Sequence, residues 1–96
     1  MRIRNFVHKG LRQLYEDDVV RGVPPDTVEK LRKMLTYLDE MESADELPVL
    51  PMWKAHRLSG NRRSVWSLSV TANRRLTYRI DEPMKEICDL NLEDYH

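Results

Sequence analysis

The spacing of apolar residues changes from a helical to a strand period near the middle of the chain, and this change limits the folds available to it. The first half carries an apolar residue every three or four positions, which is the period of a helix with one buried face. This stripe consists of Val28, Leu31, Leu35 and Leu38. The second half alternates apolar and polar residues, which is the period of a strand with one buried face. Its apolar sets are Trp66, Leu68 and Val70, and then Leu76, Tyr78 and Ile80.

Weaker signals on either side of these segments complete the expected architecture. Helices are expected at 8–18 and 26–43, the second capped by Asp26 with Glu29 as its capping-box partner. Strands are expected at 3–6, 52–58, 64–71, 74–80 and 86–92, with an extended loop at 47–51. Helices followed by a run of strands indicate an α+β domain, a small and mostly antiparallel sheet with two N-terminal helices packed on one face. A chain of 96 residues fits a single domain, residues 1–96.

The same alternation predicts what each face of the sheet carries. Because the apolar sets must face the helices, the opposite face is expected to carry polar and basic side chains. These are Ser67, Ser69, Arg75, Thr77 and Arg79. Such a face suits a phosphate backbone, and its lack of aromatic residues argues against recognition by base stacking.

Charge is segregated along a chain whose net charge is zero. Residues 51–80 contain seven bases and no acid, whereas residues 81–96 contain six acids and one base. A positive surface of this kind most commonly binds phosphates, so an RNA contact is predicted. The predicted RNA-binding residues are Lys54, Arg57, Arg62, Arg63 and Arg79. The alternative is a solvated sheet face whose bases pair with acidic helices.

Several classes of protein are disfavoured by what the sequence lacks. It has no metal-ligand spacing and no glycine-rich phosphate loop, so neither a metal nor a cofactor is expected. No stretch approaches the roughly 20 apolar residues of a membrane span, and the first ten residues lack the apolar core of a secretory signal. The single cysteine, Cys88, lies in an apolar run and is expected to be a buried thiol. Together these features predict a cytoplasmic protein with no membrane partner.

The remaining chemistry is acid–base catalysis on a phosphodiester. RNA is cleaved when its 2′-hydroxyl is deprotonated and attacks the adjacent phosphorus. The catalyst must then accept one proton, donate another to the leaving 5′-oxygen, and stabilise a dianionic transition state. Histidine suits the proton transfers near neutral pH, and arginine suits the phosphate contact. His56 lies within the basic segment, although a lone histidine is more often an ordinary surface residue.

Several motifs in combination resemble the HigB-type toxins of the RelE/ParE superfamily. The most specific are the H-x-L-x-G-x-R stretch at 56–62, the A-N-x-R stretch at 72–75 and the E-D-Y-H end at 93–96. Further similarity lies in the opening residues 5–11, in the Gly-Val-Pro connector at 22–24, at 66–70 and around Tyr78. The resemblance therefore covers almost the whole chain. It implies a RelE-like fold and a bacterial endoribonuclease that cleaves mRNA in the ribosomal A site and thereby inhibits translation.

The resemblance also implies partners and roles for individual residues. The toxin would be silenced by a HigA-like helix-turn-helix antitoxin, and it would meet DNA only indirectly, through that complex. The implied catalytic residues are His56, Arg75, Tyr95 and His96. Arg75 would hold the scissile phosphate, and the terminal Tyr-His pair would orient and help deprotonate the nucleophile. The sequence departs from the family at Ser59, where related toxins have a lysine, and Arg57 is the expected substitute because residues two apart on a strand share a face.

Two other functions compete with this hypothesis. A ParE-like toxin would use the same fold to bind a protein target such as a topoisomerase, without catalysis. A plain RNA-binding or repressor module would tolerate the loss of single proton-transfer residues. The coexistence of His56, Arg75 and the Tyr95-His96 end favours the enzyme, because neither alternative needs all of these residues.

Overall fold

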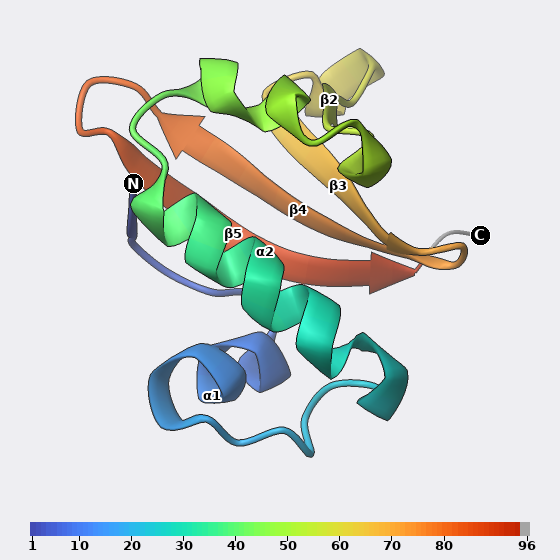
Figure 1. The fold of residues 1–96 in the computed structure, drawn as a ribbon. Helices are drawn as coiled ribbons and strands as arrows, with labels where there is room; N and C mark the ends of the chain where they lie inside the picture. Colours follow the sequence, from blue (N-terminus) through green and yellow to red (C-terminus); the bar gives the residue numbers. More distant parts are fainter. Residues whose placement is uncertain (95–96) are drawn as a thin grey trace.

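A computed structural model describes residues 1–94, which form one five-stranded sheet with two α-helices (Figure 1). The strands are β1 (Arg2–Ile3), β2 (His56–Arg57), β3 (Val65–Thr71), β4 (Arg74–Asp81) and β5 (Glu86–Asp94). Their order in the sheet is β1-β5-β4-β3-β2. All neighbours are antiparallel except β1 and β5, which run parallel. The expected α+β class and mostly antiparallel sheet are confirmed.

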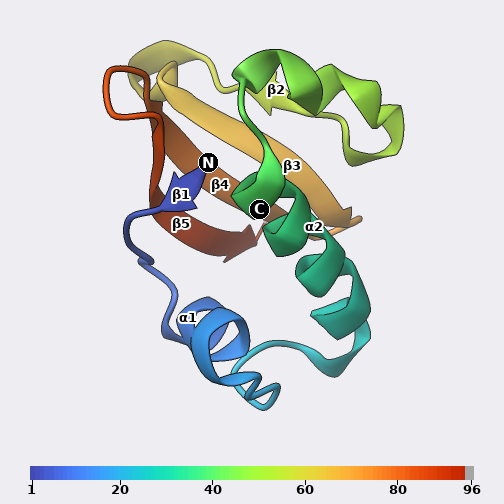
Figure 2. The ribbon, with the colours of Figure 1, turned by 60° about the vertical axis from the view of Figure 1, so that its left-hand side comes forward.

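The helices α1 (Lys9–Asp17) and α2 (Val28–Glu40) pack on one side of this sheet (Figure 2). Their buried leucines meet the apolar sets of β3 and β4 in one core, as the alternation predicts. Leu68, Val70, Leu76 and Tyr78 are fully buried there, whereas Trp66 and Ile80 are only partly covered. No helix within residues 1–94 is both long enough and apolar enough to cross a membrane.

Three local expectations are wrong. Asp26 does not cap α2, because a 3₁₀ turn at Pro25–Thr27 precedes it and Thr27 makes no side-chain cap bond. The capping box instead joins Ser43 and Glu46 at the next segment. The expected loop at 47–51 and the first two residues of the strand expected at 52–58 lie instead in 3₁₀ helices at Ala44–Val49 and Pro51–Trp53, and only His56–Arg57 of that strand forms. The prolines favour such short turns because they fix φ near the helical value.

The start of α1 packs on the connector before α2 through two glycines. A Cβ atom on Gly10 would lie 1.9 Å from the carbonyl oxygen of Gly22, which is far inside contact distance. One on Gly22 would lie 2.7 Å from the Cα atom of Gly10. Two backbones therefore touch at this point, and only glycine permits their approach.

We expect Gly10→Ala to destabilise the protein by at least about 1–3 kcal/mol, since the added methyl group must displace a backbone segment. This loss opposes the gain of up to ~1 kcal/mol that alanine normally gives over glycine in a helix. Urea unfolding followed by circular dichroism measures the change. Arg12→Ala in the same helix is the control, because the Arg12 side chain is half exposed. A Gly10→Ala protein as stable as its parent would contradict this packing.

Candidate active site

The candidate residues lie in two rows that cross the sheet on the face away from the helices. Paired residues of antiparallel strands project from the same face. The first row runs from β2 to β5 through His56, Ser67, Thr77 and Asn91. The second runs from β3 to β5 through Ser69, Arg75 and Glu93. With strands about 4.8 Å apart and about 3.4 Å per residue, His56 and Arg75 lie two strands and one row apart, which puts their backbones on the order of 12 Å from each other.

The orientation of the His56 ring is set by its own backbone. Nδ1 lies 2.8 Å from the carbonyl oxygen of Lys54. Because a carbonyl oxygen only accepts, Nδ1 carries the hydrogen and donates it. Nε2 is then the nitrogen that can take up or release a proton. The side chain is exposed at the edge strand, so this nitrogen is accessible to a substrate.

A hollow of about 520 Å³ opens beside His56. Its lining consists of Lys30, Met52, Lys54, His56, Ser69, Val70, Thr71 and Ala72. Two lysines and a histidine therefore face it, and among the described residues no carboxylate belongs to its lining. Cationic and hydroxyl side chains around a hollow favour an anionic ligand such as a phosphate.

Arg75 lies near the start of β4, on the outer face. Its side chain is 19% exposed, and its Nη2 atom lies 3.7 Å from Oε1 of Glu93. Arg62, in the 3₁₀ turn Gly60–Arg62, binds the same carboxylate with both terminal nitrogens, at 3.0 and 2.6 Å. The Thr77 hydroxyl also donates to it. These donors lower the pKa of Glu93, chiefly through Arg62, so the carboxylate stays ionised at neutral pH.

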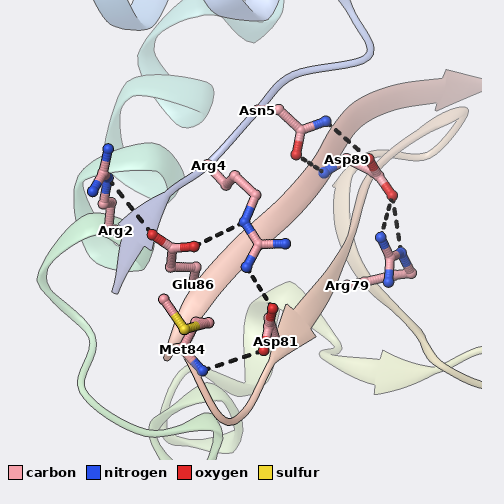
Figure 3. Close-up of polar contacts among 8 residues, drawn as sticks. All are labelled: Arg2, Arg4, Asn5, Arg79, Asp81, Met84, Glu86 and Asp89. Atoms are coloured by element: carbon pink, nitrogen blue, oxygen red, sulfur yellow. Dashed lines mark hydrogen bonds and ion pairs between the residues drawn. The ribbon is translucent and has the colours of Figure 1, made fainter.

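The separation of charge along the sequence is largely cancelled in space, because β5 brings its acids beside the basic strands. Arg79 pairs with Asp89 at 2.7 Å (Figure 3), and Arg74 pairs with Asp94 at 3.4 Å. Arg62 and Arg75 both pair with Glu93, so four of the seven bases in residues 51–80 have an acidic partner. The cancelling acids come from the last strand, not from helices. The positive surface is therefore narrower than the sequence predicts, and it centres on the hollow beside His56.

The expectation of an open polar platform is also wrong in part. Ser67 and Thr77 are almost completely buried, whereas Ser69 is only partly covered. The bidentate pair between Arg62 and Glu93 bridges from the turn before β3 to β5 across this region. A second, smaller hollow of about 150 Å³ remains on this face, and Arg62, Thr77, Arg79, Asn91 and Glu93 are among its lining residues.

Arg57 does not join these residues. Its guanidinium lies 5.3 Å from the centre of the Trp66 ring, and the pairing of Arg57 with Trp66 puts it on the face opposite His56. The strand β2 ends at Arg57, so the two-residue rule does not extend to Ser59, which leads into a 3₁₀ turn. Arg63, beside that turn, is exposed. The cations that line the hollow together with His56 are instead Lys30 and Lys54.

The two terminal candidates, Tyr95 and His96, lie outside the described residues. Among the described residues, sequence reasoning missed Lys30 and Glu93. Lys30 is one of several charges on the exposed side of α2, and no sequence signal distinguishes it. Glu93 had a usable signal, since it belongs to the E-D-Y-H motif and has the strand parity of Asn91, but its pairing with Arg75 depends on the register of β4 and β5.

The described fold is that of RelE-like toxins. It matches a YoeB/ParE toxin from Agrobacterium tumefaciens with a TM-score of 0.63 and 17% identity over 100% of both chains. The toxin–antitoxin complex RelBE2 from Mycobacterium tuberculosis matches with a TM-score of 0.50 and 18% identity over 98% of this chain and 96% of that chain. At such identities the likeness concerns the fold alone.

Within this fold class, the chain belongs to the HigB-like toxin family. The family described as the RelE-like toxin of the type II toxin-antitoxin system HigB matches residues 4–96. The chain is also 38% identical to the endoribonuclease HigB of Proteus vulgaris over 94 residues, which cover 98% of this chain and 99% of that protein. The family expected from the motifs is thus confirmed.

Proposed function

We propose that this protein is a ribosome-dependent mRNA endonuclease, the toxin of a type II toxin–antitoxin pair. The observation that carries the proposal is the shared face of His56 and Arg75 in a chain of the HigB-like family. An imidazole can accept or donate a proton, and a guanidinium can hold a phosphate. The endoribonuclease activity named for the Proteus vulgaris relative supports the same chemistry.

In the proposed reaction, the 2′-oxygen attacks the adjacent phosphorus and the bond to the 5′-oxygen breaks. The proton leaves the 2′-hydroxyl for a base, and an acid protonates the departing 5′-oxygen. His56, through Nε2, and His96 share these two transfers. Arg75 contacts the phosphate oxygens, where negative charge grows in the transition state. Tyr95 orients the nucleophile, and Lys54 binds the neighbouring backbone beside the hollow.

The ribosome supplies the fixed RNA conformation that the protein does not provide. His56 is exposed on an edge strand, so little of the protein encloses the RNA at this position. Aligning a 2′-hydroxyl with its phosphate in a flexible single strand costs entropy, which a fixed conformation on the ribosome would offset. We therefore expect cleavage in the ribosomal A site, within codons that are being translated.

The proposal includes a partner and a place of action. A helix-turn-helix antitoxin of the HigA type would bind the toxin in the bacterial cytoplasm, and contact with operator DNA would be made through the antitoxin. The RelBE2 complex, a fold relative, is a toxin bound to its antitoxin and supports such pairing.

The proposal is tested by inducing the protein in bacteria under tight control and mapping the 5′ ends of mRNA. We expect new ends within translated regions, in register with the reading frame, within minutes of induction. The Arg75→Ala protein is the matched control. Growth arrest without new mRNA ends would instead favour a ParE-like toxin that binds a protein target.

A further inference from the structure

We propose that Glu93 is a positioning residue of the active site, which fixes Arg75 and the 59–63 loop against the strand that leads to Tyr95 and His96. This inference rests on the proposed function and adds a residue to it. Glu93 reaches a second site segment through Arg62, which lies in the turn between β2 and β3. It therefore joins parts of the site that are about 30 residues apart in the sequence.

The geometry of the contacts supports this role. Both oxygens of the Glu93 carboxylate accept from the Arg62 fork, an arrangement that fixes direction as well as distance. The Thr77 hydroxyl donates from the neighbouring strand, and Arg75 lies 3.7 Å away as the direct partner of Glu93 across β4 and β5. Moving this carboxylate would therefore shift both arginines.

Burial distinguishes this pair from an ordinary surface ion pair. The Glu93 side chain is 20% exposed, against 42% for Arg62, and Thr77, which donates to Glu93, is almost completely covered. A bidentate pair in partly desolvated surroundings is stronger and more directional than an exposed one. The Arg62 fork is also committed to Glu93, so we infer that Arg62 acts on cleavage through the position of its loop.

Glu93 is not placed in the proton transfers. Arg62 and the Thr77 hydroxyl stabilise the ionised carboxylate and lower its pKa, and a carboxylate that accepts several hydrogen bonds is a poor base. If Glu93 acts by positioning Arg62, replacing Glu93 should have little further effect in a protein that already lacks Arg62. This comparison separates a positioning role from direct participation in the reaction.

The test compares Glu93→Gln, Arg62→Gln and the double variant on mRNA-programmed ribosomes. We expect each single variant to lower the maximal cleavage rate by roughly ten- to a hundredfold, as a displacement of about 1 Å can do. The toxin concentration that gives half the maximal rate should stay within about threefold of the parent. The double variant should be no slower than the slower single variant, because both changes break one pair.

Glu86→Gln is the matched control. Glu86 is also a partly buried carboxylate of β5 and pairs with Arg4 at 2.8 Å, but it lies at the other end of the strand (Figure 3). The Glu86→Gln protein should cleave mRNA at the parent rate. Amide hydrogen exchange provides a readout that does not depend on activity. The amides of residues 60–64 should exchange faster in Glu93→Gln than in the parent, and at the parent rate in Glu86→Gln. If Glu93→Gln does not fold, the same exchange measurement on Arg62→Gln tests the positioning role.

Three results would overturn the positioning role while leaving the proposed function intact. They are a folded Glu93→Gln or Arg62→Gln protein that cleaves at the parent rate, a double variant whose losses multiply, and an equal loss in Glu86→Gln. A parent protein that does not cleave on ribosomes would refute the proposed function, and the positioning role with it.

Discussion

Replacing Arg75 by alanine is expected to lower the rate of mRNA cleavage on ribosomes by ~10²–10³ while the protein stays folded. The loss of one contact that forms with the transition-state charge typically has this size. The fold should persist because Arg75 projects from the face away from the core and leaves no core cavity. Its ion pair with Glu93 is long, at 3.7 Å, and Glu93 keeps Arg62 and Thr77 as partners.

The measurement is the single-turnover cleavage rate on programmed ribosomes, with the thermal midpoint as the check of folding. Arg12→Ala is the control for loss of an arginine, since Arg12 lies on α1 and pairs only loosely with Glu16, at 3.9 Å. A folded Arg75→Ala protein that cleaves near the parent rate would remove Arg75 from the site.

Deleting Tyr95 and His96 should abolish cleavage with little loss of stability. Both residues are implied in orienting and deprotonating the nucleophile, so their removal should cost at least as much as one transition-state contact, ~10²-fold or more. Stability should be nearly unchanged because terminal residues seldom carry core packing. Within the described residues, the core is formed by side chains from both helices and from the sheet.

Toxicity in cells and cleavage on ribosomes are measured together with the unfolding midpoint. The double replacement Tyr95→Ala/His96→Ala keeps the chain length, and it separates loss of the two side chains from a shifted terminal carboxylate. A shortened protein that still cleaves would exclude these residues from catalysis. One that no longer cleaves but still arrests growth would point to a second, non-enzymatic target.

Much of the fold is predictable from the sequence because it depends on regular burial. The alternation in β3 and β4 defines both strands to within a residue, and the stripe of α2 identifies the helix that covers them. The region between α2 and β3 is not predictable in this way. Its prolines permit either an extended chain or tight 3₁₀ turns, and packing of Leu47 and Trp53 in the core selects the turns.

The candidate site, too, is predictable only where it depends on local sequence. His56 and Arg75 are predictable because their motifs lie in short segments, but their shared face depends on the register of β2 against β3. The cancellation of charge by β5 is not predictable, since it depends on which strands are neighbours and on their register. A bulge between Thr77 and Arg79 changes that register and puts Asp89 within reach of Arg79. Arg57 illustrates the same limit, because its strand ends before the parity argument can reach Ser59.

The central claim is that this protein cleaves mRNA and that the ribosome completes its active site. The most direct measurement compares the cleavage rate of one mRNA, with the same concentration of protein, when it is naked and when it is held on ribosomes with an empty A site. We expect cleavage in the A-site codon on the ribosome, and on naked RNA a rate lower by orders of magnitude, given the effective molarities that fixed geometry supplies. Efficient cutting of purified mRNA, or intact mRNA on the ribosome, would contradict the account.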